Sequence, residues 1–181
     1  MDWVIIIIIA AIVLVLVFWW ISASANYKRI AIKISEALSG MEAALTKRYD
    51  LLTKMLDAVK NHKQHEIELI AEGIKVRKGM SINELSQASV KMDNMASNLS
   101  IVTEAYPELR SSDIFKELHS GIRDSEERLQ AATRLYNANV TSLNTAVKAF
   151  PSSIIAKAQN IKELEFFSAE EAKRGNDSME F

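Results

Sequence analysis

The stretch SDIFKELHSGIRDSEERLQAATRLYNANVTSLNTAVKAF, residues 112–150, has the most regular apolar pattern in the chain and decides the fold. Apolar and small side chains recur there at alternating steps of three and four: Phe115, Leu118, Ile122, Ser125, Leu129, Ala132, Tyr136, Val140, Leu143, Val147 and Phe150. This spacing is typical of a coiled-coil seam, and its single repeated step of four is a stutter that unwinds the supercoil locally. We therefore predict one helix over residues 112–149, ended by Phe150-Pro151.

Two further helical patterns precede this one. Residues 27–77 carry a first apolar stripe, and Gly79 is expected to end it. The sequence SINE at residues 81–84 has the spacing of a capping box, in which the serine and the glutamate cap each other's backbone N–H. A second helix is predicted from there to Pro107, with a turn over residues 108–111.

The composition supports an all-α fold, because two prolines and five glycines are too few for a turn-rich β protein. Short turns make successive helices antiparallel, so we predict a long antiparallel three-helix bundle over residues 27–150. Residues 151–181 are expected to form a short helix at 153–161 and a flexible tail from Gly175. Phe166 and Phe167 are predicted to pack on the bundle or on a partner, with lipid contact as the alternative.

An apolar segment opens the chain. Residues 3–21 contain no charged side chain, and a helix of roughly 20 residues crosses a bilayer. Trp3 at one end and Trp19 with Trp20 at the other lie about 25 Å apart on a helix, which suits the two membrane interfaces. We predict that residues 1–26 form a transmembrane anchor, continuous with a helix that projects about 75 Å from the membrane.

The alternative for this segment is a cleaved signal peptide, since Ala23-Ser24-Ala25 resembles a cleavage site. An acidic start at Asp2 and the length of the apolar run favour a retained anchor. Lys28, Arg29 and Lys33 follow the span and none precedes it. Basic residues resist translocation, which predicts an external N-terminus and a cytoplasmic C-terminal domain in the cell membrane.

Charge and motif content exclude several classes of function. Beyond the anchor, 22 acidic residues balance 22 basic ones without a basic block, so no nucleic-acid binding is expected. Cysteine is absent, which removes thiol chemistry and cysteine zinc sites. The sequence also lacks a glycine-rich phosphate loop, a nucleophile elbow and a zinc-protease motif. We predict no catalytic residues, no enzymatic activity and no cofactor.

The histidines are the candidates for a metal site. His62 and His65 stand at an i, i+3 spacing that can share a helical face, and His119 lies on another predicted helix. Lys63 and Glu66 beside them indicate a solvated surface instead. The prediction is no bound metal.

Polar residues near the apolar stripes have two interpretations. They can bond across helices and fix the register of the bundle, or they can line a ligand site between helices. We favour the first role. The residues assigned to bundle register and interaction are Arg48, Tyr49, Asp50, Tyr106, Arg134, Tyr136, Asn137 and Asn144.

With these residues laid out, the chain resembles the LemA family of bacterial membrane proteins. The resemblance is carried by ALS at 37–39, KRYDLL at 47–52, HE at 65–66, AYPEL at 105–109, EERL at 126–129, YN at 136–137, FPS at 150–152, IA at 155–156, FF at 166–167 and EE at 170–171. It implies a spanning helix that carries an antiparallel helical domain, no agreed enzymatic activity, and relatives in magnetosome membrane organelles. Thr53 and Lys54 stand where the family usually has Pro-Asn, and Leu38 where it usually has tryptophan. Without that proline the first helix is expected to run unkinked.

These observations lead to three hypotheses of function. The leading one is a membrane-anchored scaffolding protein that contacts the lipid bilayer and associates with copies of itself. The alternative is a signalling adaptor that passes a signal to an unidentified cytoplasmic protein partner. The third is an enzyme or metal carrier that uses the His62/His65 face.

Overall fold

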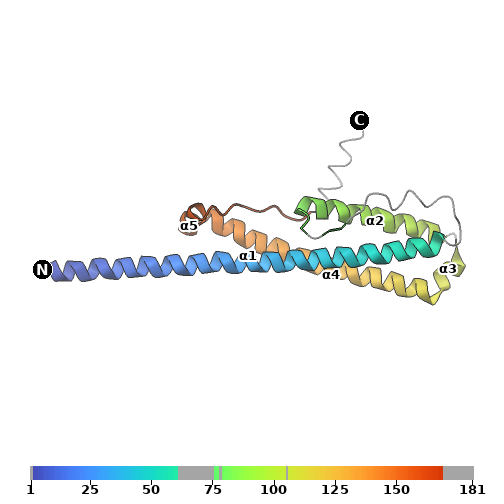
Figure 1. Cartoon of the computed structure of the whole chain (residues 1–181), viewed down its shortest axis with the longest axis horizontal. Helices are drawn as coiled ribbons and strands as arrows, with labels where there is room; N and C mark the ends of the chain where they lie inside the picture. Colours follow the sequence, from blue (N-terminus) through green and yellow to red (C-terminus); the bar gives the residue numbers. More distant parts are fainter. Residues whose placement is uncertain (1, 61–75, 78, 105, 169–181) are drawn as a thin grey trace, which may run out of the picture. The chain divides into compact units, whose positions relative to one another are not determined.

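The computed structural model describes residues 2–60, 76–77, 79–104 and 106–168, and within them every regular element is a helix (Figure 1). The helices are α1 (Asp2–Lys60), α2 (Ile82–Glu104), α3 (Pro107–Ser111), α4 (Asp113–Lys148) and α5 (Ser152–Ala158). The all-helical class, with a long apolar N-terminal helix and a short C-terminal one, is confirmed.

Helix α1 runs without a break through Thr53 and Lys54, as expected of a sequence without proline there. The first stripe was predicted to stay helical to residue 77, but Val76 and Arg77 lie outside any helix. Gly79 lies in a turn before α2 and has a φ of 82°, a left-handed conformation that glycine adopts without strain. The Gly79 N–H donates to Glu42 Oε1 at 3.1 Å, which holds the turn against α1.

The predicted capping box at the start of α2 is confirmed. Glu84 N donates to Ser81 Oγ at 3.2 Å, and Ser81 N donates to Glu84 Oε2 at 2.7 Å. The hydroxyl of Ser81 donates to the same carboxylate at 2.9 Å. These donors, with Arg77 nearby, hold the pKa of Glu84 below its ordinary value. The sequence therefore fixes the beginning of α2 through local hydrogen bonds.

The ends of the other helices differ slightly from the prediction. Residues 108–111 were expected to form a turn, but Pro107–Ser111 is the short helix α3, with proline in its first position, where a missing N–H costs nothing. The last helix spans Ser152–Ala158 instead of 153–161, because Asn160 adopts a left-handed φ of 52° just after it. The predicted tail from Gly175 lies outside the described residues.

The chain divides into two compact units. Unit 1 comprises Met1–Glu36 with Tyr136–Glu165, and unit 2 comprises Ala37–Leu135 with Phe166–Phe181. Helices α1 and α4 each contribute residues to both units. In unit 2, the core is built from apolar side chains of α1, α2 and α4 that are almost fully buried: Met41, Leu45, Leu52, Leu56, Leu85, Met92, Met95, Leu99 and Leu129.

The helix directions in unit 2 correct one part of the prediction. Helix α4 is antiparallel to α1, since a Cβ at Gly40 would lie 3.5 Å from the Cβ of Ala132, and one at Gly121 would lie 3.1 Å from Leu51 Cδ1. Helix α2 instead runs parallel to α1: Glu42 bonds Gly79 and Arg48 bonds Asp93. The prediction of three antiparallel neighbours rested on a short turn at Gly79. Gly79 instead lies beside Glu42, 18 residues before Lys60, so α2 starts there and runs toward the end of α1.

Unit 1 has a small core of its own. Its buried side chains come from α1, from the C-terminal part of α4 and from α5: Tyr27, Ile34, Tyr136, Val140, Leu143, Ile155 and Ala156. The phenol of Tyr27 donates to the carbonyl of Ala146 at 2.7 Å and lies 3.2 Å from that of Ser152. One aromatic side chain thus joins all three helical segments of unit 1.

Candidate functional site

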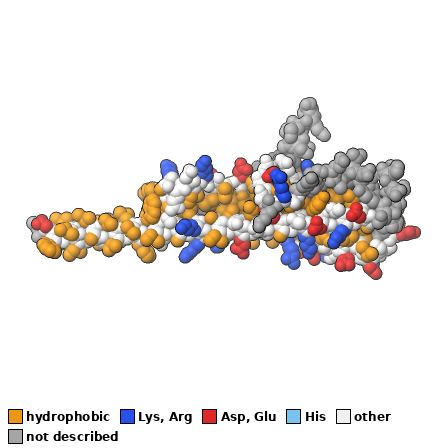
Figure 2. Space-filling model, in the orientation of Figure 1, with side chains coloured by type: hydrophobic (Ala, Val, Ile, Leu, Met, Phe, Trp, Pro, Cys, Tyr) orange, Lys and Arg blue, Asp and Glu red, His pale blue; other side chains and the backbone are white. Residues whose placement is uncertain are grey.

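The N-terminal part of α1 is an exposed apolar surface, which Figure 2 shows as a segment covered with hydrophobic side chains. Trp3 is 82% exposed and Trp20 is 40% exposed, while Trp19 is half-buried and Lys28 and Arg29 are exposed. Among the described helices, α1 alone has the length and apolar composition to cross a membrane, and no part of its most apolar window is buried. A soluble helix would bury one face, so this surface suits a bilayer.

Arg48 forms a charge cluster in unit 2 together with Asp93 and Glu126. Its side chain projects from α1 and is only 5% exposed as a residue. Arg48 Nη2 donates to Asp93 Oδ1 of α2 at 2.8 Å, and Arg48 Nη1 lies 2.9 Å from Glu126 Oε2 of α4. Desolvating a guanidinium costs several kcal/mol, which two close carboxylates offset. The Arg48 cluster therefore joins one helix to the other two through a single buried cation.

The hydrogen bonding of the Arg48 cluster is incomplete. Arg48 Nε and Nη1 and Glu126 Oε2 have no hydrogen bond to any described residue, because the 2.9 Å approach has ion-pair distance without hydrogen-bond alignment. A buried unpaired donor costs about 1–3 kcal/mol. The cluster is thus held by charge more than by aligned hydrogen bonds, and removal of the cation would leave two carboxylates facing each other.

A shallow pocket of about 380 Å³ lies against the acidic side of the Arg48 cluster. Asp93 and Glu126 line it together with Leu129, Arg134 and Phe167. Phe167 is 7% exposed, so the predicted packing on the bundle holds for this phenylalanine, whereas Phe166 is 49% exposed. The carboxylates are each about one-third exposed through this opening, at 33% and 34%.

The other residues assigned to bundle register are spread over both units. In unit 2, Tyr49 and Tyr106 are half-buried, while Asp50 and Arg134 are exposed. Backbone groups of the two tyrosines bond locally: Tyr49 O accepts from Thr53 Oγ1, and Tyr106 N donates to Thr103 O. Of the unit 2 residues in this set, Arg48 is the one that the structure ties to two other helices.

In unit 1, the assigned residues bind the segment that follows α5. The Asn144 amide donates to Leu164 O and accepts from Leu164 N, both at 2.9 Å, which imitates a pair of backbone hydrogen bonds. The Tyr136 hydroxyl donates to Glu165 O at 3.1 Å, and Lys148 pairs with Glu163 at 2.8 Å. Asn137 is half-buried and also has an interaction partner. These side chains fasten residues 163–165 along α4.

Burial of Tyr136, and secondly the negative charge of Glu165, raises the pKa of its phenol above the ordinary value. In the unfolded chain the phenol ionises near pH 10. Above that pH the folded state holds the proton that the unfolded state has lost, so stability falls from about pH 10 up to the folded pKa. We expect Tyr136→Phe to flatten this part of the stability–pH curve, as measured by urea unfolding between pH 8 and 11. An unchanged slope in the variant would contradict the assignment.

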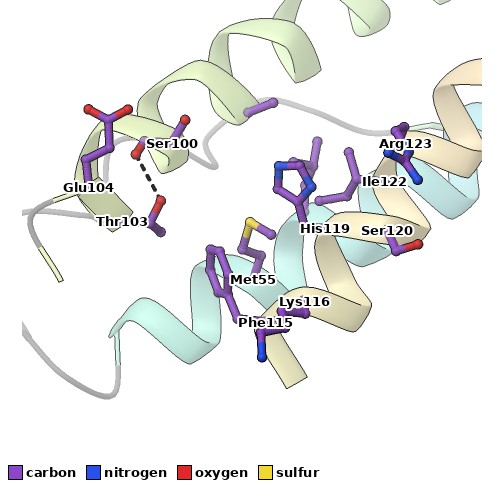
Figure 3. A pocket seen from close by; sticks show the side chains of 12 residues that line it. Met55, Ser100, Thr103, Glu104, Phe115, Lys116, His119, Ser120, Ile122 and Arg123 are labelled. Carbon is purple, nitrogen blue, oxygen red and sulfur yellow. Dashed lines mark hydrogen bonds between the residues drawn. The ribbon is translucent and has the colours of Figure 1, made fainter. Parts of the chain in front are cut away.

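A second cavity of about 450 Å³ opens between α1, α2 and α4 in unit 2 (Figure 3). Leu52, Met55 and Phe115 supply apolar lining, and His119 and Arg123 of α4 also line the cavity. Thr103 Oγ1 donates to Ser100 O at 2.9 Å, so this hydroxyl serves the helix backbone. Its lining is thus mixed, with apolar side chains beside hydroxyl groups, basic side chains and the carboxylate of Glu104, and nothing in the sequence pattern predicted this cavity.

The structure describes only one of the three histidines considered as metal ligands. His62 and His65 lie outside the described residues, and His119 lines the cavity just described. Within the described ranges, no group of three or more His, Asp and Glu side chains could hold a metal ion. The prediction about the His62/His65 face therefore remains a prediction.

Comparison with known proteins gives a consistent result. Residues 37–181 match the model of the LemA family. The chain is 26% identical over 147 residues to Protein LemA of Metamycoplasma hominis, across 78% of this chain and 67% of that protein. It is 27% identical over 74 residues to Magnetosome protein MamQ of Magnetospirillum gryphiswaldense, across 41% of this chain. This second match spans only 27% of the length of MamQ.

In the part of the chain that the structure describes, the fold and its surfaces define an all-helical protein with one helix suited to crossing a membrane. The family match covers most of the chain, from the beginning of unit 2 onward. The chain belongs to the LemA family.

Proposed function

We propose that this protein is a membrane-anchored structural protein that associates with copies of itself to organise a patch of membrane or to hold partners there. The observation that carries the proposal is α1, a continuous helix whose exposed apolar beginning leads into the buried core of the bundle. The anchor and the first helix of the bundle are therefore parts of the same continuous helix. We assign the protein no catalytic role, no cofactor, and a cytoplasmic bundle with the N-terminus outside.

Lateral self-association is supported by large apolar side chains that stand exposed on the bundle helices of unit 2. Ile101 of α2 is 65% exposed, and Ile114 and Leu135 of α4 are 70% and 61% exposed. Single exposed apolar residues are common on monomers. In a membrane, however, anchoring confines all copies to two dimensions and raises their effective concentration, so weak apolar contacts are sufficient. The relative named as a magnetosome protein fits a role in cellular organisation.

Disulfide trapping in membranes tests this proposal, because the chain contains no cysteine of its own. Single cysteines at Ile101, Ile114 and Leu135 are expected to give covalent dimers on mild oxidation, for at least one position. Gln87→Cys, at an exposed polar position of α2, is the matched control. If all three positions cross-link no more than the Gln87 control, self-association through these helix faces is wrong.

The signalling adaptor remains the alternative, and the cavity of unit 2 is the observation that favours it. A cavity of about 450 Å³ with a mixed polar and apolar lining could receive a partner segment, and Lys116, His119 and Arg123 outnumber Glu104 along it, which favours an acidic one. Purification of the membrane-embedded protein discriminates the two functions. A stoichiometric foreign protein that is lost in Phe115→Glu would favour the adaptor, and recovery of this chain alone would favour the scaffold.

A further inference from the structure

Helix α5 and the turn before it carry apolar side chains that face outward. Phe150 is 83% exposed and Ile154 is 49% exposed, whereas the neighbouring Ile155 and Ala156 are buried at 0% and 1%. The short helix is therefore amphipathic, with one apolar face packed into unit 1 and a second one left uncovered among the described residues. Nothing in the core of unit 1 requires that second apolar face.

Two hydrogen bonds fix the position of α5 relative to the apolar stretch of α1. The Tyr27 hydroxyl lies 3.2 Å from Ser152 O at the beginning of α5, and Gln159 Nε2 donates to Ser24 Oγ at 2.8 Å just after its end. Ser24 and Tyr27 follow Ile21 by about 4.5 and 9 Å along the helix axis. Helix α5 thus lies within about one headgroup layer of the predicted end of the span.

The same two bonds join both ends of α5 to one short stretch of α1. Ser24 and Tyr27 are only about 4.5 Å apart along the helix axis. With α1 spanning the bilayer, as proposed above, α5 therefore lies at the level of the membrane surface.

The charge around α5 complements a phospholipid surface. The part of unit 1 beyond the apolar stretch, residues 22–36 and 136–165, contains six basic and three acidic residues. Lys28, Arg29 and Lys157 are exposed. Figure 2 shows basic side chains beside the place where the apolar covering of α1 ends. Basic groups next to apolar ones are the combination that binds anionic lipid interfaces.

We propose that the face formed by Phe150 and Ile154 is an interfacial lipid-binding element. Both side chains enter the boundary between headgroups and acyl chains, in the leaflet from which α1 emerges, and Lys28, Arg29 and Lys157 contact lipid phosphates. This inference rests on the proposed membrane anchor. It gives unit 1 a second contact with the bilayer, which restricts rotation of α1 about its own axis.

Spin labels on the full chain in lipid nanodiscs test the proposal. Phe150→Cys and Ile154→Cys are labelled singly, in nanodiscs of mixed zwitterionic and anionic phospholipid. Accessibility to oxygen, which partitions into lipid, is compared with accessibility to a water-soluble nickel chelate. Val13→Cys reports on the span, and Gln87→Cys, at an exposed polar position of α2 in unit 2, is the aqueous control. Both substituted positions of the α5 face are exposed, so folding is not at risk.

The expected result is a shift of the depth parameter at residues 150 and 154 away from the Gln87 control and toward the Val13 value. Labels at 150 and 154 that match the Gln87 control, with Val13 deep in lipid, would overturn the interfacial contact and leave the anchor intact. An aqueous label at Val13 would remove the anchor and this inference together.

Discussion

Arg48→Met is expected to lower the free energy of unfolding by about 2–4 kcal/mol, because it removes a buried cation from between two carboxylates. Asp93 and Glu126 approach the guanidinium at 2.8 and 2.9 Å from different helices, and each is about one-third exposed. Solvent at the carboxylates places the loss toward the lower part of the range known for broken buried pairs. Methionine keeps most of the volume, so a cavity contributes little. Denaturant unfolding followed by circular dichroism in detergent measures the change.

Two controls separate lost charge pairing from a general effect of substitution. Arg134→Met removes an exposed arginine of α4, and it is expected to change stability by less than about 0.5 kcal/mol. The triple variant Arg48→Met, Asp93→Asn, Glu126→Gln removes the facing negative charges as well. We expect this triple variant to regain most of the free energy of unfolding that Arg48→Met loses. Equal stability of Arg48→Met and Arg134→Met would refute the role given to the Arg48 cluster.

Two arginines in the apolar stretch, Ile12→Arg with Val13→Arg, are expected to abolish retention in the membrane. Residues 3–21 contain 14 Ile, Val, Leu and Phe residues, which contribute roughly −4 to −8 kcal/mol to insertion. Each arginine near the centre of a span costs about 2.5–3.5 kcal/mol. The two changes therefore cancel most or all of the driving force, whereas one arginine would be tolerated.

Extraction of membranes with alkaline carbonate, followed by flotation, measures this effect. The matched control places the same two arginines on the bundle, as Ile101→Arg with Ile114→Arg, where the exposed side chains lie outside the span. That control is expected to stay with the floated membranes. A double-arginine variant of the span that floats as fully as the wild type would show that α1 is held by something other than insertion.

The sequence alone was sufficient for features that depend on local chemistry. The alternating steps of three and four over residues 112–150 predicted α4 nearly to its ends. The prediction was reliable because the step from one apolar position to the next occurs ten times along this helix. Ser81 and Glu84 predicted the start of α2, since a capping box is made by residues three apart in one segment. The continuity of α1 from the apolar stretch into the bundle followed from the absence of proline and glycine before Gly40, whereas its end was not predicted.

The direction of α2 could not be obtained in this way. The apolar stripe of α2 is compatible with a helix that is parallel or antiparallel to α1, because periodicity defines which face is buried and not the direction of the helix. Gly79 correctly marked a turn, but its position beside Glu42, 18 residues before Lys60, depends on the tertiary fold. The expectation of antiparallel neighbours therefore failed for α1 and α2 and held for α1 and α4.

The Arg48 cluster was less predictable from the sequence than the helices. Arg48 stood out because it lies beside an apolar stripe, yet its partners Asp93 and Glu126 sit on helices far away in sequence. Asp93 directly follows Met92 and Glu126 directly follows Ser125, and both preceding residues are fully buried. An acidic residue next to a buried position is a pattern that could have identified the two as candidates. Choosing Asp93 and Glu126 among the other acidic residues requires knowing how each of the three helices is oriented about its own axis. The contact of Tyr27 with α5 likewise depends on the tertiary fold.

The mass of the particle in a native-like membrane disc tests the central proposal, a membrane-anchored protein that self-associates. The polypeptide has a mass of 20.3 kDa. Discs excised from expressing membranes with an amphipathic polymer preserve lateral contacts, and native mass spectrometry then counts the chains released from each disc. The account predicts a discrete multiple of 20.3 kDa that persists as the protein is diluted into excess lipid. A single 20.3 kDa chain in every disc, at all protein-to-lipid ratios, would contradict it.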